Sequence, residues 1–190
     1  MILRTTPRRM TDLKINVRDR IYLSGVSMAD KPALLAHLQT KEIYDTTLNI
    51  PYPYSGADAD WWIGKRIEHT RRQGKESTFA IRDDGQLIGI VGADSFDIGL
   101  AHRAEIGYWL ARGYWGRGVT TDAVRAFVQY AFAELEVMRL TAHVFAFNIA
   151  SARVLEKNGF TLEGSLRKHF LKDGQPIDAR LYGLLKDELS

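Results

Sequence analysis

The chain contains no cysteine. Without thiols it cannot form disulfides, a zinc–thiolate site or a cysteine nucleophile. It also has no apolar run that approaches the roughly 18 residues needed by a membrane-spanning helix. Its N-terminal segment, which includes Arg4, Arg8 and Arg9, lacks the apolar stretch of a signal peptide. We therefore expect a cytoplasmic protein that does not contact a membrane.

The sequence also has little excess charge of one sign and no residue spacing typical of a metal site. The formal net charge is only +3, which is too small to indicate a nucleic-acid partner. Basic residues do concentrate in the first twenty positions, where they could contact RNA or form a solvated terminal segment. We favour the solvated segment. The five histidines show no ligand-like spacing, so no metal is expected. They are His37, His69, His102, His143 and His169.

The length and the apolar content favour one folded domain. The chain has 190 residues, of which 45% are hydrophobic, and this is enough for a core of ordinary size. No internal repeat, low-complexity stretch or linker divides the sequence. We therefore treat residues 1–190 as a single domain.

The pattern of apolar residues predicts both strands and helices. The clearest helix covers 119–135, where apolar residues at three-to-four spacing form one face. Asp30, followed by Pro32, is expected to cap a helix that ends near residue 37. Further helices are expected at 57–72 and 151–157. Strands are expected at 14–17, 21–27, 78–82, 87–94, 104–110, 140–147, 160–169 and 180–185. The order indicates a mixed α/β domain around a mainly antiparallel sheet.

Two glycines, Gly116 and Gly118, stand between the apolar segment 106–110 and the helix that begins at residue 119. Glycine lets the backbone turn tightly and approach a ligand closely. The first N–H groups of a helix have no partner within it, and the helix dipole favours an anion there. The arrangement is typical of a phosphate or pyrophosphate site, although a plain strand-to-helix turn would look the same. The P-loop pattern is absent, and Thr121 stands where a dinucleotide fingerprint requires its third glycine.

Four segments carry a resemblance to a known family: Ala104–Leu110, Tyr114–Ala123, Asn148–Phe160 and Leu162–Arg167. In this order they resemble the GCN5-related N-acetyltransferases (GNAT), and in particular the RimJ/RimL-like branch of ribosomal-protein N-acetyltransferases. The resemblance extends over nearly the whole chain. It implies a GNAT fold, which is an α/β sheet of about seven strands flanked by helices. The fourth and fifth strands would splay apart, with coenzyme A in the gap from one side and the amine acceptor from the other.

The resemblance also implies acetyl-CoA as co-substrate. Backbone N–H groups of the glycine loop would bind its pyrophosphate, and the strand before the loop would pair with the pantetheine amides. Asn148 would bond the pantetheine arm or cap the following helix. Arg117 could pair with a phosphate or stay solvated, and Asp122 is expected to face away from the anion. The expected cofactor-binding residues are Trp109, Leu110, Trp115, Gly116, Arg117, Gly118, Val119, Thr120 and Asn148.

Acetyl transfer needs a neutral amine, a polarised carbonyl and a stabilised thiolate. The tyrosine acid of many family members is absent, because Leu155 occupies its place. By resemblance, Ser151 is the candidate hydrogen-bond donor to the thiolate, unless it is only a small helix residue. Glu105 is the candidate base and would act through a water. The alternative is that it is only an ion-paired residue of the strand. His169 is a second choice of base, next to Phe170, where the ribosomal enzymes of this branch have a glutamate.

The pKa of the acceptor amine narrows the choice of acceptor class. An α-amine, with a pKa of about 7.7–8.0, is far more often neutral near pH 7 than a lysine amine with a pKa of about 10.4. A site with one weak base therefore favours a protein or peptide N-terminus. Aromatic residues Tyr52, Tyr54 and Trp61 lie where the family shapes its acceptor cleft, and they could pack on a substrate or close the core. Three aspartates could instead attract a small polyamine or cationic antibiotic. These are Asp45, Asp94 and Asp97.

The sequence thus predicts an acetyl-CoA-dependent N-acetyltransferase that acts by direct transfer in a ternary complex. Two alternatives stay open, a small-molecule amine acetyltransferase and a coenzyme-A-binding regulatory module without catalysis. The oligomeric state is also left open, with a homodimer as one option.

Overall fold

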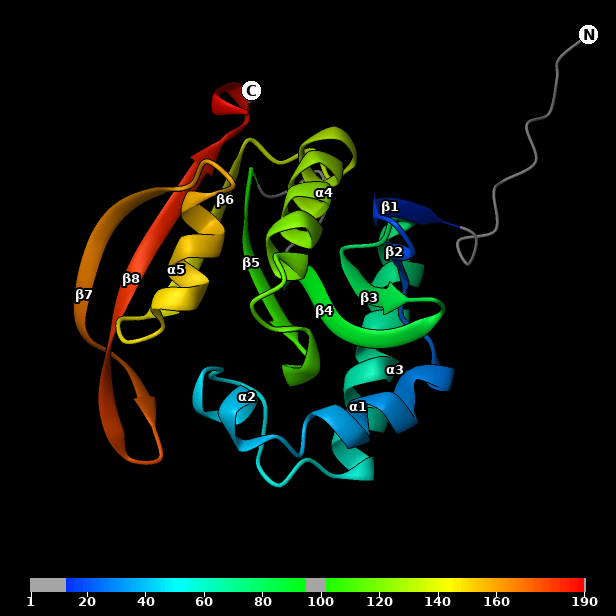
Figure 1. Ribbon diagram of the computed structural model, residues 1–190. Coiled ribbons are helices and arrows are strands. Elements are labelled where there is room, and N and C mark those ends of the chain that lie inside the picture. The colour runs from blue at the N-terminus through cyan, green and yellow to red at the C-terminus, as the bar shows by residue number, and fades with distance from the viewer. Residues whose placement is uncertain (1–12, 95–101, 190) are drawn as a thin grey trace, which may run out of the picture.

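The computed structural model describes residues 13–94 and 102–189, which form one sheet with helices on both faces (Figure 1). The sheet has eight strands in the order β1-β2-β3-β4-β5-β6-β8-β7. All neighbouring pairs are antiparallel except β5 and β6. The expected mainly antiparallel α/β class is confirmed.

The strands and helices largely follow the predicted ranges. The strands are β1 (Lys14–Arg18), β2 (Ile21–Gly25), β3 (Thr78–Asp83), β4 (Gln86–Asp94), β5 (Arg103–Leu110), β6 (Arg139–Phe145), β7 (Thr161–Lys172) and β8 (Gln175–Leu185). The helices are α1 (Lys31–His37), α2 (Lys41–Asp45), α3 (Gly56–Gln73), α4 (Val119–Glu134) and α5 (Ile149–Glu156). Short 3-10 turns cover Met28–Asp30, Arg112–Tyr114 (η3) and Lys186–Glu188. Helix α2 was not expected, because five residues are too few to show a helical period.

Asp30 occupies the N-cap position of α1, as expected, but its side chain does not cap the helix. Its backbone is already helical, and its side chain makes no cap hydrogen bond to α1. The buried carboxylate instead accepts hydrogen bonds from Arg82 at 2.7 and 3.0 Å and from the backbone N–H of Ser27 at 2.8 Å. A buried guanidinium offers a charge-assisted pair that satisfies the acid more fully than helix N–H groups would.

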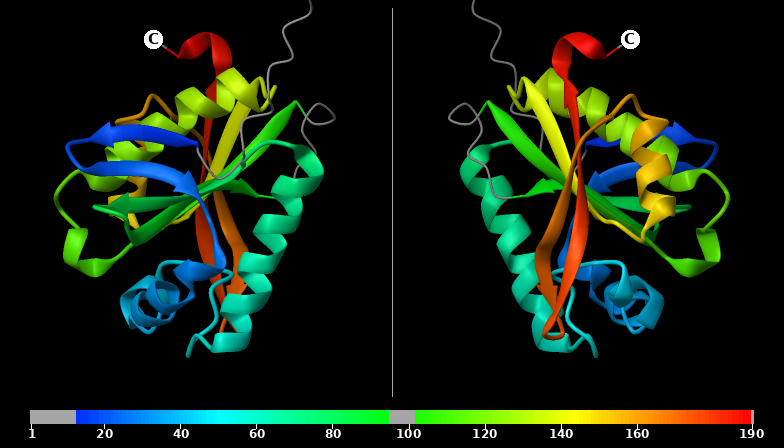
Figure 2. Two further views of the ribbon diagram at one scale, coloured as in Figure 1. Left: turned by 90° about the vertical axis from the view of Figure 1, so that its right-hand side faces the viewer. Right: turned by 90° about the vertical axis from the view of Figure 1, so that its left-hand side faces the viewer.

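The helices divide between the two faces of the sheet, and each face has its own core. Helices α4 and α5 pack with the main core, which includes Phe79, Ile106 and Phe127. Helices α1, α2 and α3 enclose a second cluster that contains Leu34 and Ile63. Figure 2 shows α3 on the opposite side of the sheet from α4 and α5. The central strands are thus held rigidly from both sides.

The sheet opens between β5 and β6. These parallel strands pair only from Arg103↔Arg139 to Glu105↔Thr141. Strand β5 then continues beside β4 as far as Leu110, while β6 continues beside β8 as far as Phe145. The expected divergence of the family's fourth and fifth strands is therefore present here between β5 and β6.

Candidate functional site

The glycine loop between η3 and α4 has the backbone that the sequence predicts. Gly116 and Gly118 have φ of 73° and 76°, which is a left-handed conformation that side chains disfavour. The N–H groups of residues 116–121 make no hydrogen bond within the described part of the chain. The first N–H in use is that of Asp122, which donates to the Gly118 carbonyl at 3.1 Å. Six successive donors thus remain available at a helix N-terminus, which is a ready anion site.

An arginine from the first strand braces this loop. Arg18 donates to the Arg117 carbonyl at 2.6 Å and to the Asp122 carboxylate at 3.1 Å. Asp122 also pairs with Arg125 at 3.1 Å. Its negative charge, which would repel a phosphate, is therefore compensated by two guanidinium groups. The Arg117 guanidinium itself lies 5.7 Å from the centre of the Tyr114 ring.

The turn η3 fixes where the loop begins. The Tyr114 hydroxyl donates to Asp83 at 2.8 Å, and the Arg20 guanidinium also contacts this carboxylate, at 2.5 Å. The hydrogen bond to Asp83 and the nearby charge raise the pKa of Tyr114, so its hydroxyl stays a donor. The Trp115 indole N–H donates to the Leu110 carbonyl at 2.7 Å. Loop and strand end are thus joined directly.

Strand β5 presents alternate backbone groups to the gap. The N–H of Ala111 donates to Ile88 at 2.7 Å, and the register with β4 is regular back to Glu105. In an antiparallel ladder only every second residue bonds its partner strand, so the backbone of Trp109 faces β4. The polar groups of Ile106 and Tyr108 face the gap. The Leu110 carbonyl also faces it but is already used by Trp115.

Ser151 lies at the start of α5, next to a residue that the sequence analysis did not single out. The Tyr108 hydroxyl is 2.8 Å from Ser151 Oγ and 3.1 Å from the Ser151 carbonyl. Burial raises the pKa of Tyr108. Asn148 caps the helix by accepting from the Ser151 N–H at 3.1 Å, which is one of its two expected roles. Leu155 is fully buried in the core, so no acid stands there.

Glu105 is paired with a histidine. Its carboxylate lies 2.9 Å from His143 Nδ1 on β6. The His143 ring is stacked on His169, with centroids 4.9 Å apart and planes 12° apart, and Phe170 meets both rings edge-on. The sequence gives only part of the signal for this cluster, namely the strands on which its members lie. Residues 105 and 143 lie on adjacent strands at the point where pairing ends, but their contact depends on a register that the sequence does not reveal.

The three aromatic residues expected near the acceptor occupy different environments. Tyr54 is buried in the second cluster, which raises its pKa to about 12, so it closes the core. Trp61 is 62% exposed on α3. The Tyr52 ring lies 5.3 Å from Tyr44 and lines a cavity of about 270 Å³ between the 48–52 loop and the tip of the β7–β8 hairpin.

Of the three aspartates expected to attract a cation, only Asp45 has a described side chain. Asp45 is already paired with Lys41 at 2.6 Å. The Asp94 side chain and Asp97 lie outside the described residues.

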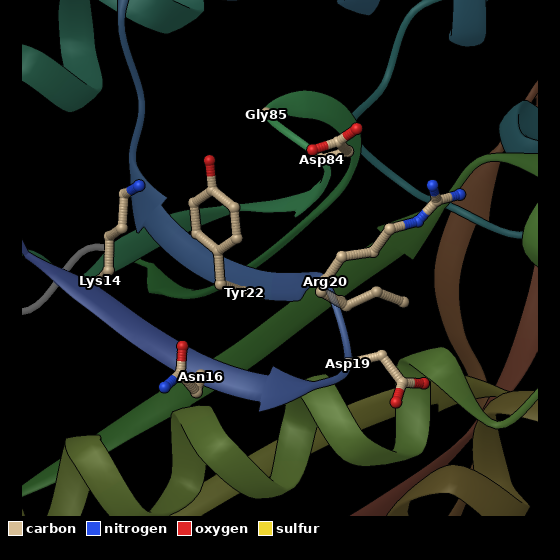
Figure 3. A pocket seen from close by; sticks show the side chains of 8 residues that line it. Lys14, Asn16, Asp19, Arg20, Tyr22, Asp84 and Gly85 are labelled. Atoms are coloured by element: carbon tan, nitrogen blue, oxygen red, sulfur yellow. The ribbon is translucent and has the colours of Figure 1, made fainter.

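A second hollow, of about 400 Å³, lies at the other edge of the sheet (Figure 3). Its lining includes Lys14, Arg20 and Tyr22 from the first hairpin and Asp84 from the β3–β4 turn. Strands β3 and β4 separate this hairpin from β5 in the sheet. The hollow is therefore separate from the gap between β5 and β6, although Arg20, which lines it, also contacts Asp83 beside η3.

The family follows from comparison with known proteins. Residues 20–161 match the family described as "Acetyltransferase (GNAT) domain". The chain belongs to the GNAT acetyltransferases. None of the helices in the described residues is long and apolar enough to span a bilayer.

Among curated relatives, GNAT proteins of bacilli are similar to this chain. The uncharacterized N-acetyltransferase p20 of Bacillus licheniformis is 29% identical over 172 residues, which cover 90% of this chain and 95% of p20. The uncharacterized N-acetyltransferase YoaA of Bacillus subtilis is 38% identical over 106 residues, but these cover only 55% of this chain and 59% of YoaA. The ribosomal-protein-serine acetyltransferase of Escherichia coli is 32% identical over 117 residues, which cover 61% of this chain and 64% of that enzyme.

Solved GNAT structures share the fold. RimL, a ribosomal L7/L12 α-N-protein acetyltransferase in complex with coenzyme A, superposes with a TM-score of 0.83 at 22% identity, covering 93% of this chain and 99% of RimL. The microcin C7 self-immunity acetyltransferase MccE, in complex with acetyl-CoA and AMP, gives a TM-score of 0.81 at 22% identity, covering 93% of this chain and 98% of MccE. The resemblance to the RimJ/RimL-like branch is confirmed.

Proposed function

We propose that this protein transfers the acetyl group of acetyl-CoA to the N-terminal α-amine of a protein or peptide, directly and in a ternary complex. The observation that carries the proposal is the row of unpartnered N–H groups at residues 116–121, beside a gap between β5 and β6. Family membership supplies the reaction class. The coenzyme A in the RimL structure and the acetyl-CoA in the MccE structure support the choice of cofactor.

Each part of the site then has a role. The loop from Gly116 to Thr121 holds the pyrophosphate through its backbone. Trp115 was also expected to contribute, but its N–H already donates to the Arg112 carbonyl at 3.1 Å. The pantetheine arm pairs with the gap-facing backbone groups of Ile106 and Tyr108 rather than with Trp109, whose backbone faces β4. Ser151 donates a hydrogen bond to the leaving thiolate. The proton of the amine leaves through the pair formed by Glu105 and His143.

The α-amine is favoured over a cationic small molecule. Asp45, the one expected aspartate whose side chain is described, is neutralised by Lys41. An α-amine also needs less help to lose its proton than a lysine amine does. The ribosomal-protein acetyltransferases among the relatives support a protein N-terminus.

The test is thiol release from acetyl-CoA with two panels of acceptors, one of peptides with varied N-terminal residues and one of polyamines and aminoglycosides. We expect release with free N-terminal peptides and none with the same peptides blocked at the α-amine. Mass spectrometry should place the acetyl group on the N-terminus. Release only with the small amines would identify a small-molecule enzyme. Tight coenzyme A binding without release would indicate a regulatory module.

A further inference from the structure

The space next to the last β5–β6 pair is bounded by a small group of side chains. Glu105, Gly107 and Trp109 project from one face of β5, and Thr141 and His143 project from the same face of β6. This follows because Glu105 and Thr141 are paired and side chains alternate along each strand. A Cβ built on Gly107 would have no heavy atom within 4 Å. The acceptor amine therefore has open space above Gly107, with His143 across the gap.

His143 lies further into the open part of the gap than Glu105 does. Strand pairing ends at Glu105↔Thr141, so Glu105 lies at the closed end of the gap. His143 is two residues further along β6, in the part that has left β5. Its side chain is 21% exposed, whereas that of Glu105 is 50% exposed.

The contact with Glu105 favours the tautomer in which the His143 imidazole can act as a base. Glu105 lies 2.9 Å from Nδ1. A carboxylate at that position holds the proton on Nδ1, which leaves Nε2 with a lone pair. This is the arrangement in which a carboxylate orients a histidine that takes a proton at its other nitrogen.

Strand β7 fixes the orientation of the ring from the other side. The pairing of β7 with β8 is irregular between Leu166 and Phe170, and Lys168 within it has φ of 50°. Bulges of this kind redirect side chains and are common beside active sites. Here the bulge brings His169 flat against His143 and Phe170 edge-on to it. The imidazole is thus held between a carboxylate and two rings.

We propose that His143 is the catalytic base of the proposed acetyl transfer and that Glu105 is the positioning residue that fixes its tautomer. As the amine nitrogen bonds to the thioester carbon, its proton passes to His143 Nε2. The carbon–sulfur bond breaks and its electron pair goes to sulfur, which then takes up a proton. The imidazolium returns its proton to solvent. The inference rests on the proposed function and changes only which side chain accepts the proton.

The decisive experiment compares His143→Gln and Glu105→Gln, with His102→Gln as a matched control at an exposed histidine outside this cluster. With the best peptide of the panel, we expect His143→Gln to lower kcat about 100-fold or more, as loss of a general base does. Glutamine at 105 can still accept from Nδ1–H, so Glu105→Gln should cost about tenfold or less. His102→Gln should stay close to wild type, and the KM for acetyl-CoA should be unchanged in all three variants.

A second readout does not depend on turnover. The ¹⁵N shifts of the histidine side chains should show neutral His143 protonated on Nδ1, and Glu105→Gln should weaken that preference. A proton on Nε2, or full activity in His143→Gln together with a large loss in Glu105→Gln, would overturn the assignment. Absence of any acetylated product with the wild-type protein would instead overturn the proposed function.

Discussion

At the scale of single residues, Tyr108 decides what Ser151 can do. The tyrosine hydroxyl has one proton and two neighbours, the Ser151 carbonyl at 3.1 Å and Ser151 Oγ at 2.8 Å. If the tyrosine hydroxyl donates to the carbonyl, the serine hydroxyl must donate its own proton to the tyrosine oxygen. If the tyrosine hydroxyl donates to Oγ, the serine proton is free to point at the thiolate sulfur. Burial raises the pKa of Tyr108, so the tyrosine orients Ser151 and does not act as the acid itself.

This arrangement predicts coupled effects in Ser151→Ala, Tyr108→Phe and the double variant. We expect Ser151→Ala to lower kcat about 10- to 100-fold through loss of one hydrogen bond to the leaving group. Tyr108→Phe should produce a loss of the same kind, and the double variant should be no slower than Ser151→Ala, because the two hydroxyls act as a unit. Steady-state kinetics of the three proteins measure this. Independent losses that multiply, or a change confined to the KM for acetyl-CoA, would assign Tyr108 a structural role.

At the scale of elements, the glycine loop depends on the backbone conformation of its glycines. Gly113 and Gly116 lie three residues apart, and a Cβ at either would meet no heavy atom within 4 Å. Only Gly116 has a positive φ, of 73°. The pair therefore separates the effect of backbone conformation from the effect of space.

Gly116→Ala should strain the loop, whereas Gly113→Ala should not. A non-glycine residue in the left-handed region costs about 1–2 kcal/mol, so we expect a lower Tm and an acetyl-CoA Kd raised by about tenfold. Gly113→Ala should leave both unchanged or raise stability slightly, because it only restricts the unfolded chain. Calorimetry and thermal melts give the two quantities. Equal behaviour of the two variants would mean that the bend at Gly116 is unimportant for binding.

The elements also show what a sequence can and cannot predict here. Helix α4 and the glycine loop were predictable because their signals are local, a long apolar period and two glycines at a strand-to-helix turn. The pairs Glu105–His143, Tyr108–Ser151 and Arg18–Asp122 join residues 38, 43 and 104 positions apart. Such contacts depend on strand order and register, which local patterns do not specify. The burial of Tyr54 was hidden for the same reason, since it results from α1 and α3 packing together.

At the scale of the whole molecule, the short helix α2 links the two sides of the site. Towards the glycine loop, Glu42 pairs with Arg112 of η3 at 2.7 Å. Towards the β7–β8 hairpin, the Tyr44 hydroxyl donates to Asp173, and Lys172 lies 3.5 Å from the Tyr44 ring centre and donates to the Thr47 carbonyl at 2.8 Å. In Figure 1, α2 lies below the end of β5 and beside this hairpin. Helix α2 thus holds together the hairpin tip and the 48–52 loop, which form the wall of the cavity that Tyr52 lines.

If this wall contacts the acceptor, loosening it should change acceptor binding alone. Tyr44→Phe removes the hydroxyl that reaches Asp173 but keeps the ring that faces Lys172 and Tyr52. Because the contact is exposed, we expect a modest rise of about two- to fivefold in the KM for the peptide, with the KM for acetyl-CoA unchanged. Glu42→Gln is the matched control on the same helix, since it breaks the contact on the opposite side and should leave the peptide KM as it is. An unchanged peptide KM in Tyr44→Phe, or equal shifts in both variants, would place the acceptor away from the hairpin tip. In that case Phe147, which is 57% exposed and contacts the buried Phe145 ring, would be the residue to alter next.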